Sequence, residues 1–360
     1  MKRVSISGLV PGMITAEEIY DLNHHMILPK GLVLTDHTIT KLELYSILSI
    51  KVEDPKIENE EAPQKAAVDN SYAYRLKKTP EFQRFEENFL NLTNAFKNIM
   101  DQATKNVDTL DTDQMLSHVD TLLHDKDKRI NVFDMLHNMR EFSDATYIHC
   151  INVGLICNIL AHWLHMSPED IKTATLCGLL HDVGKLMIPD NILAKPGKLT
   201  DWEYRIMQTH PKEGYDLLKS ANISEHIKNA ALMHHERCDG SGYPKRLRTE
   251  SIDPYAKMVA IADVYDAMTS ARLYRGPQCP FKVISAFENE GLQKYDPHYI
   301  LTFLKNIVDT YLGQSVRLSN GEVGEIVFIN QTKLSRPTVK VGEKYIDLAA
   351  YPSLYIDAVV

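Results

Sequence analysis

The chain has 360 residues, of which 44% are hydrophobic and 24% are charged, a globular composition long enough for two or three domains. Its formal net charge of -8 excludes an overall basic field that would attract duplex DNA or RNA or an acidic membrane. The sequence shows no signal-peptide core and no run near the roughly 18 apolar residues of a membrane helix, so we expect a cytoplasmic protein without membrane partners.

Residues 1–54 predict a small α+β domain. Short β-like runs at residues 26–28 and 31–34 lie near prolines and glycines, and Asp36 can cap a helix that continues to Leu48. Residues 55–79 combine prolines and acidic side chains with few large apolar groups, which predicts a linker.

Residues 80–129 predict connecting helices. Thr79 and Pro80 form a helix start, and apolar residues then alternate at spacings of three and four along one narrow seam. The seam contains Phe82, Phe85, Phe89, Leu92, Phe96 and Ile99. It can join two copies of the chain as a homodimer, or it can pack the helix onto its own domain; the seam is short for a coiled coil.

Residues 130–312 predict an all-α domain, because helical patterns follow one another with almost no strand signal. The predicted helices span residues 132–144, 147–163, 169–182, 202–219, 225–234, 255–271, 281–291 and 298–312. After them, Asn320 and Gly321 between alternating segments give a strong hairpin signal, and residues 313–360 predict a β-rich tail of four or five strands. The predicted fold class is therefore mainly α.

Polar residues within apolar helical segments mark the candidate chemistry of this domain. His181 and Asp182 follow an apolar run, and Asp263 lies inside another. Burying such groups without a partner costs roughly 2–7 kcal/mol each by transfer scales, so we expect them to be paired or coordinated. Further histidines in or next to helical segments are His149, His210, His234 and His235.

Together these seven residues supply five imidazoles and two carboxylates. This mixture of nitrogen and oxygen ligands suits iron, manganese, nickel or zinc better than calcium or magnesium. The ligands are too many for one ion, which favours a binuclear site with Asp182 as the bridge. Two metal ions a few Å apart can clamp a phosphodiester and activate water for an in-line displacement.

The order and spacing of these motifs resemble the HD-GYP metal-dependent phosphodiesterases, a branch of the HD superfamily. The matching segments are residues 181–185 (HDVGK), 234–244 (HHERCDGSGYP) and 262–270 (ADVYDAMTS). The similarity spans roughly residues 130–312. It implies an all-α HD-type bundle that hydrolyses a cyclic dinucleotide, above all cyclic di-GMP, to linear pGpG or onward to GMP.

The resemblance also implies ligands for two divalent metal ions, with iron or manganese expected and nickel or zinc as alternatives. One ion would be held by His149, His181, Asp182 and Asp263. The second would be held by Asp182, His210, His234 and His235. Some members hold a third ion through a glutamate four residues before the first histidine, where this chain has Ala145 beside Asp144, so we expect two ions.

Other matching residues are implied to act on the substrate. Lys185 would stabilise charge at the scissile phosphate, beside the catalytic Asp182. Arg272 and Arg275 match positions that contact substrate phosphate, although solvated cations at a helix end are an equal alternative. Gly242 and Tyr243 match a loop near the substrate, and Tyr243 can equally anchor that loop.

Two further interpretations stay open. A non-hydrolytic receptor or scaffold would bind the cyclic dinucleotide and signal through the flanking domains, but degenerate relatives usually lose ligands and this chain keeps all seven. An HD hydrolase of another phosphate ester, such as guanosine tetraphosphate, is disfavoured by the GYP motif. The motifs do not decide between cyclic di-GMP and a mixed cyclic GMP-AMP.

Overall fold

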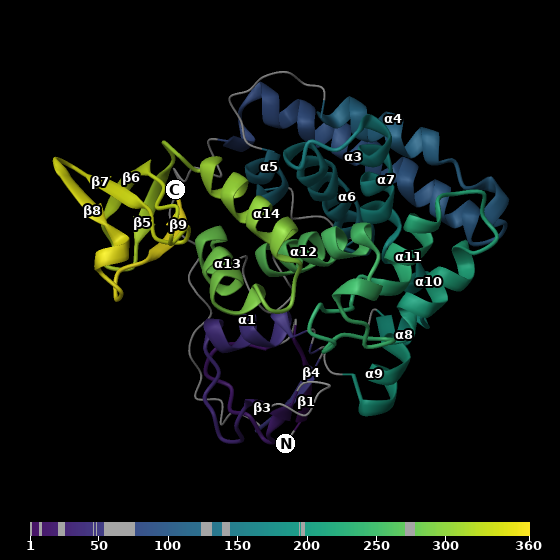
Figure 1. Ribbon diagram of the computed structural model, residues 1–360, viewed down its shortest axis with the longest axis horizontal. Coiled ribbons are helices and arrows are strands. Elements are labelled where there is room, and N and C mark those ends of the chain that lie inside the picture. Colours follow the sequence, from purple (N-terminus) through teal and green to yellow (C-terminus); the bar gives the residue numbers. More distant parts are fainter. Residues whose placement is uncertain are drawn as a thin grey trace.

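The computed structural model describes residues 2–6, 9–20, 26–45, 47, 49–53, 76–123, 132–138, 145–193, 195, 199–270 and 278–360. A helical body carries a small mixed unit from the N-terminal segment and an antiparallel sheet from the C-terminal segment (Figure 1). The predicted fold class is confirmed. Most of the predicted linker lies outside the described residues, and the domain boundaries stay predictions.

The N-terminal unit consists of two short strand pairs and one helix. Strand β1 (Lys2–Ser5) pairs antiparallel with β4 (Ser49–Val52), and β2 (Ile19–Tyr20) with β3 (Met26–Leu28). Helix α1 (Asp36–Leu44) begins where predicted but ends before Leu48, because the chain must turn there to enter β4. The unit has its own apolar core, which includes Leu9 and Leu34.

The helix after the predicted linker is α3 (Pro80–Ala103). Thr79 caps it by accepting a hydrogen bond from the Phe82 backbone N–H, and Pro80 occupies its first turn. All six residues of the predicted seam are at most 5% exposed and belong to the main apolar core of this chain. The seam therefore packs within the chain, which is the second of the two alternatives, and a homodimer through it is not supported.

The remaining helices build the body that holds the polar motifs. After η2 (Val107–Thr109) come α4 (Thr112–Leu123), α5 (Val132–Asn138), α6 (Ala145–Trp163), α7 (Pro168–Leu180), η3 (Val183–Met187), α8 (Asp190–Leu193), α9 (Asp201–Met207), α10 (His210–Leu218), α11 (Glu225–Met233), η4 (Thr249–Ser251), α12 (Pro254–Thr269), α13 (Pro280–Ala286), η5 (Phe287–Gly291) and α14 (Pro297–Asp309). Ser167, Thr200 and Asp253 cap α7, α9 and α12 by accepting a bond from a backbone N–H two or three residues later.

The single helix predicted over residues 202–219 is wrong, because α9 ends at Met207 and α10 starts at His210. Pro211 explains the break. Proline has no backbone N–H, so it cannot donate to the Met207 carbonyl four residues earlier. That carbonyl accepts a hydrogen bond from Nδ1 of His210 instead, at 2.7 Å.

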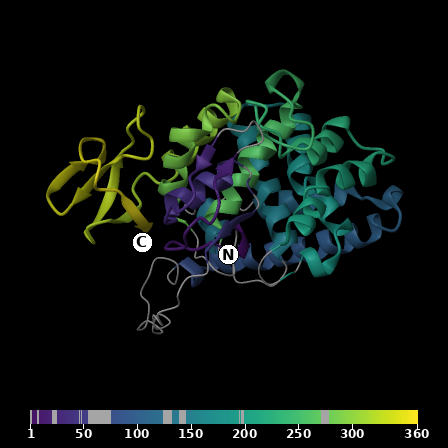
Figure 2. The ribbon, with the colours of Figure 1, turned by 90° about the horizontal axis from the view of Figure 1, so that it is seen from below.

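The C-terminal segment forms a five-stranded antiparallel sheet in the order β8-β7-β6-β5-β9. Its strands are β5 (Ser315–Leu318), β6 (Val323–Phe328), β7 (Thr338–Val341), β8 (Lys344–Asp347) and β9 (Ile356–Val359), with η6 (Leu348–Ala350) after β8. The predicted hairpin at Asn320 and Gly321 joins β5 to β6. The sheet lies at one end of the molecule in both views, and α13 contacts both β9 and helix α1 (Figure 1, Figure 2).

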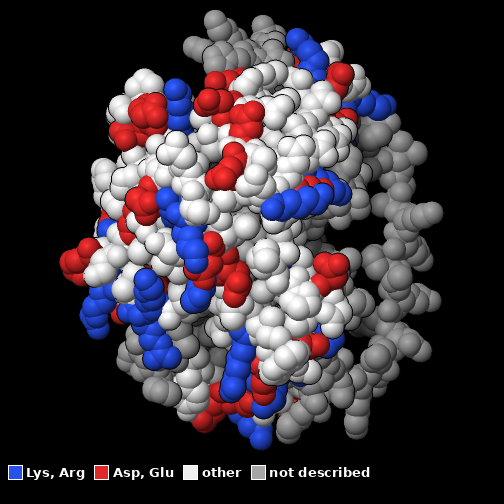
Figure 3. Space-filling view, turned by 90° about the vertical axis from the view of Figure 1, so that its right-hand side faces the viewer, with Lys and Arg blue, Asp and Glu red and all other residues white. Residues whose placement is uncertain are grey.

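Surface charges of both signs are intermixed on the face shown in Figure 3, and neither sign forms an extended field there. Within the described residues, no helix has both the length and the apolar character that crossing a bilayer requires.

Candidate active site

Three histidines of the predicted cluster lie at helix ends, and each is held by a backbone carbonyl. His181 follows α7, His210 begins α10 just after α9, and His234 follows α11. Carbonyls in the last turn of a helix have no partner inside the helix. Here they accept hydrogen bonds from the histidine Nδ1 atoms, at 2.7 Å for Gly178, 2.7 Å for Met207 and 3.0 Å for Ala231.

These bonds fix the tautomer of the three rings. A carbonyl oxygen can only accept, so in the neutral ring the proton lies on Nδ1 and Nε2 keeps its lone pair. The Nε2 atoms of His210 and His234 lie 3.2 Å apart, and two facing lone pairs at that distance repel unless a cation lies near both. Within the described part of the chain, the buried His181 Nε2 has no hydrogen-bond partner either.

Asp182 presents its two carboxylate oxygens to different histidines. Its Oδ1 atom lies 3.2 Å from Nε2 of His210 and 3.6 Å from Nε2 of His234. Its Oδ2 atom lies 3.3 Å from Nε2 of His181 and 3.7 Å from Nε2 of His149. The side chain is 1% exposed, so this carboxylate is shielded from water.

The potential ligand atoms fall into two groups that share Asp182. Those of Asp182, His210, His234 and His235 all lie within 4.8 Å of one another, and so do those of His149, His181 and Asp182. Burial lowers the pKa of His234 to about 4 and that of His235 well below its ordinary value, so both rings are neutral at pH 7. Neutral imidazoles and carboxylates are transition-metal ligands, and this cluster fits such an ion.

His149, on α6, is held by side chains rather than by the backbone. Its Nδ1 atom lies 2.8 Å from Oδ2 of Asp266, whose Oδ1 accepts a hydrogen bond from Asn152 at 2.9 Å. Its Nε2 atom lies 3.1 Å from Oδ1 of Asp263. Burial disfavours protonation of His149, but hydrogen bonds with Asp263 and Asp266 raise its pKa to about 9.

Asp266 and Asn152 were not singled out by the sequence analysis. Asp266 stands three residues after Asp263 on α12, a spacing that places both side chains on one helix face, and this spacing was the available signal. Asn152 likewise lies three residues after His149 on α6. A carboxylate on the outer nitrogen of a metal-binding histidine orients the ring and makes it more basic.

His235 is positioned by Tyr243, whose ring stacks on the imidazole with centroids 4.6 Å apart. Tyr243 is 5% exposed, and its buried hydroxyl has no hydrogen-bond partner among the described residues. Gly242 packs on the backbone beside it, because an added Cβ would lie 2.4 Å from Cα of Glu236. These contacts favour the loop-anchor alternative for Tyr243, and contact of either residue with substrate stays a prediction.

The loop that follows His234 and His235 is held in place by two buried charged side chains. Glu236 is 2% exposed, and its two oxygens accept backbone hydrogen bonds from Lys245 at 2.7 Å and Leu247 at 2.8 Å. Lys294 is 3% exposed and donates to Asp239 at 3.2 Å. Neither role was predicted from the sequence.

Lys185 lies at the edge of the cluster and pairs with Asp182. Its side chain is 24% exposed, whereas that of Asp182 is 1% exposed. Burial disfavours ionisation of Asp182, but the positive charge of Lys185 holds its pKa well below the ordinary range. Asp182 is therefore an anion at pH 7, with Lys185 as its partner on the open side.

Gly184 allows the segment that carries Asp182 and Lys185 to lie directly on α10. A Cβ at this position would lie 1.9 Å from the carbonyl oxygen of His210 and 2.4 Å from the backbone nitrogen of Gly214. The glycine between the aspartate and the lysine therefore serves the packing that brings Asp182 to His210.

Three residues of the sequence-based predictions lie outside the described residues: Asp144, Arg272 and Arg275. Ala145 is the first residue of α6. The structure thus brings together all seven predicted metal ligands and Lys185, while the two arginines stay predictions.

Comparisons with known proteins agree with this arrangement. The HD domain family matches residues 114–299, about half of the chain. The cyclic di-GMP phosphodiesterase PA4108 of Pseudomonas aeruginosa is 37% identical over 212 residues, which cover 59% of this chain and 51% of that protein. A cyclic di-GMP phosphodiesterase of Thermotoga maritima is 36% identical over 192 residues, covering 52% of each chain.

A 3'3'-cGAMP-specific phosphodiesterase 2 of Vibrio cholerae is 38% identical over 177 residues, covering 49% of this chain and 34% of that protein. The chain thus spans about half the length, or less, of the curated relatives it matches. The resemblance drawn from the sequence motifs is confirmed by these matches. The chain belongs to the HD domain family.

Proposed function

We propose that this chain is a metal-dependent phosphodiesterase that hydrolyses a cyclic dinucleotide, with cyclic di-GMP as the favoured substrate and linear pGpG or GMP as the product. One observation carries the proposal: the two oxygens of buried Asp182 face two separate groups of histidine Nε2 atoms. The names of the three relatives, which are cyclic di-GMP and 3'3'-cGAMP phosphodiesterases, support the substrate class.

We assign two metal ions to the cluster, with Asp182 as the bridge between them. One would be held by His149, His181, Asp182 and Asp263. The other would be held by Asp182, His210, His234 and His235. Iron and manganese are the favoured ions and nickel and zinc the alternatives, because imidazole and carboxylate ligands accept several first-row metals according to their availability.

When bound, the two ions supply Lewis-acid activation of the phosphodiester and of the attacking water. Asp182 fixes the spacing of the site because its two oxygens face the two groups. Lys185 lies beside Asp182 at the open edge, where its ammonium can stabilise charge on the phosphoryl and leaving oxygens. Arg272 and Arg275 are proposed to bind the substrate phosphates, for which a guanidinium fork is suited.

The test uses protein purified without oxygen and loaded with iron or manganese. We expect it to convert cyclic di-GMP to linear product, as measured by chromatography, and to lose this activity after metal removal. The double variant His181→Ala with Asp182→Ala should lose turnover by on the order of 10⁴-fold or more, because residues that act as a unit fail together. Metal-loaded protein that leaves a panel of cyclic dinucleotides intact would reject the proposal.

The second candidate function is a receptor that binds the dinucleotide without turnover. Calorimetry and product chromatography on the same sample separate the two functions, since a receptor gives binding heat and no product. The panel also contains 3'3'-cGAMP, because one relative is named for that substrate. The ratio of kcat/KM values for the two dinucleotides decides which is preferred.

A further inference from the structure

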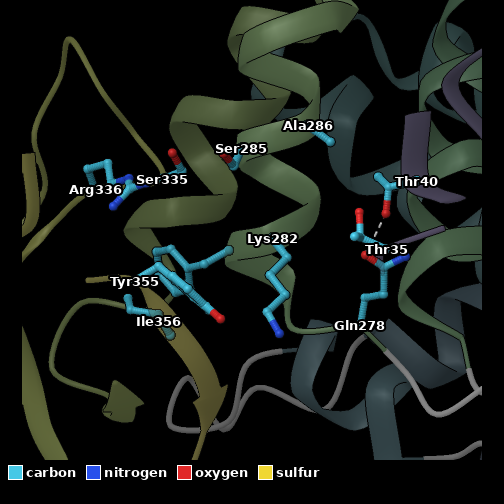
Figure 4. A pocket seen from close by; sticks show the side chains of 11 residues that line it. Thr35, Thr40, Gln278, Lys282, Ser285, Ala286, Ser335, Arg336, Tyr355 and Ile356 are labelled. Atoms are coloured by element: carbon cyan, nitrogen blue, oxygen red, sulfur yellow. Dashed lines mark hydrogen bonds between the residues drawn. The ribbon is translucent and has the colours of Figure 1, made fainter. Parts of the chain in front are cut away.

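A cavity lies where the N-terminal unit, the helical body and the C-terminal sheet meet. Its volume is about 370 Å³, within the range of pockets that hold small molecules. Thr35 and Thr40 line it from the N-terminal unit, Lys282 from α13, and Arg336 and Tyr355 from the C-terminal segment. Figure 4 shows Lys282 extending into the space between the Tyr355 side and the Gln278 side.

The cavity is basic although the chain as a whole is acidic. Two cations, Lys282 and Arg336, line it, and no acidic side chain is among the described residues of its wall. Among the described residues, Lys282 shares its carboxylate partner, Asp357, with Arg317, at 3.0 Å and 3.3 Å respectively. Arg336 donates to the Leu354 carbonyl at 2.7 Å and has no carboxylate partner within the described chain. Positive charge is therefore in excess here.

The walls of the cavity are fixed by hydrogen bonds between segments far apart in the sequence. Thr40 donates to the Gln278 side chain at 2.8 Å, which joins α1 to the start of α13. The carboxylate of Glu288 accepts backbone hydrogen bonds from Leu334 at 2.5 Å and Ser335 at 3.1 Å, which holds the segment before Arg336 on η5. The cations thus stand on ordered supports.

Neutral polar groups complete the wall. Thr35, Ser285 and Ser335 contribute hydroxyl groups, which can donate to the oxygens of an anion. A guanidinium, an ammonium and several hydroxyls around one space are the groups that bind phosphate. None of the residues that line this cavity belongs to the histidine and aspartate cluster.

We propose that this cavity binds a small phosphorylated molecule, with its phosphate between Lys282 and Arg336. Because the wall comes from all three parts of the chain, the bound molecule contacts all three at once and stabilises their packing. The site is separate from the metal cluster and does not depend on the function proposed for that cluster.

The test measures binding of GMP, as a phosphorylated probe, to the full chain in the presence of EDTA. Isothermal titration calorimetry should show saturable binding of GMP, whereas guanosine, which lacks the phosphate, should bind at least tenfold more weakly. The double variant Lys282→Gln with Arg336→Gln should weaken GMP binding at least tenfold. The charge-conserving pair Lys282→Arg with Arg336→Lys should retain it, and Lys333→Gln, an exposed position in the same segment outside the cavity, should bind as the wild type does.

Absence of saturable GMP binding to the wild type would overturn the proposal. A second outcome would also overturn the proposal. If the Lys282→Gln, Arg336→Gln variant binds GMP as tightly as the wild type and His234→Ala does not bind it, GMP binds at the metal cluster. If the glutamine variant does not fold, the rate at which Lys282 is acetylated in the wild type tests the site instead. GMP but not guanosine should slow its modification, and equal rates would reject the site.

Discussion

Backbone carbonyls hold three histidines of the cluster, whereas side chains hold the other two. His181, His210 and His234 donate from Nδ1 to carbonyls at helix ends, and no single substitution can delete a carbonyl. His149 depends on Asp266, and His235 rests on the ring of Tyr243. The helix ends therefore set the geometry of the site, and its side-chain-supported half can be weakened one residue at a time.

The part of the cluster held by backbone carbonyls, which contains His181, His210 and His234, should be most sensitive to the packing of η3 on α10. Gly184→Ala places a Cβ 1.9 Å from the His210 carbonyl oxygen, so the backbone of one element must move. We expect a loss of about 1–3 kcal/mol in the free energy of unfolding, as for overpacked cores, and a loss of most bound metal. Chemical denaturation and elemental analysis measure the two effects.

Gly214→Ala is the matched control for this variant, since its Cβ would meet the Gly184 nitrogen at 3.1 Å. It should cost clearly less stability and retain metal. Equal metal content in the wild type and Gly184→Ala would show that close packing of this turn does not position Asp182 and His210.

Asp266→Asn tests the part of the cluster held by side chains, in which Asp266 supports His149. The variant keeps the shape but loses the charge that orients His149, and partners of this kind typically cost roughly 10- to 100-fold in metal affinity or activity when changed. We expect a loss in that range, with kcat restored in part by excess metal. If Asp266 only stabilised the fold, the variant would be less stable and excess metal would not restore its kcat.

Asp216→Asn serves as the control for Asp266→Asn, because Asp216 pairs with surface lysines away from the cluster. It should leave metal affinity and activity unchanged. Metal affinity in Asp266→Asn equal to that of the wild type would show that Asp266 does not support His149 as a metal ligand.

Tyr243 should support His235 through its ring and not through its hydroxyl. Tyr243→Phe retains the stack and removes a buried hydroxyl that lacks a partner among the described residues, so stability and metal content should stay near wild-type values. Tyr243→Leu loses the stack, worth about 0.5–1.5 kcal/mol, and should bind metal more weakly. A large loss of kcat in Tyr243→Phe would instead point to contact between the hydroxyl and the substrate.

A further expected effect concerns pH and the metal-free protein. Burial lowers the pKa of His234 to about 4 in the folded state, while the unfolded chain takes up the proton near pH 6.5. The unfolded state then binds more protons than the folded state between these values, so stability should fall as the pH decreases from about 6.5 towards 4. His149, with a raised pKa of about 9, is already protonated in the folded state, so its contribution has the opposite sign while the unfolded chain takes up this proton near pH 6.5.

Denaturation of the metal-free protein at pH 7 and at pH 5 measures this effect, and His234→Gln is the control. The variant should show a shallower dependence over this interval. A pH dependence of equal slope in the wild type and the variant would contradict the buried, neutral state of His234.

The sequence predicted the helical fold and the seven cluster residues because both depend on local patterns and motif order. The break between α9 and α10 was missed, since Pro211 also fits the first turn of a helix and only the position of Met207 shows which carbonyl it leaves unpaired. Asp266 belongs to one of the matching segments, but its role could not be predicted because its partner His149 is distant in the sequence. Such pairings arise from tertiary packing.

The cavity at Lys282 was also beyond sequence-based prediction. Its wall draws on residues as distant as Thr40 and Tyr355, and no motif links them. The burial of the α3 seam, in contrast, was one of two stated alternatives, and only the arrangement of the neighbouring helices decides between them.

The most direct test of the central claim is the metal content of the anaerobically purified chain, measured by elemental analysis alongside its turnover of cyclic di-GMP. We expect two transition-metal ions per chain, full turnover only with both bound, and loss of both ions and turnover in Asp182→Ala. A chain that hydrolyses cyclic di-GMP at full rate with one ion or none, or an Asp182→Ala variant that keeps two ions, would contradict a two-metal site bridged by Asp182.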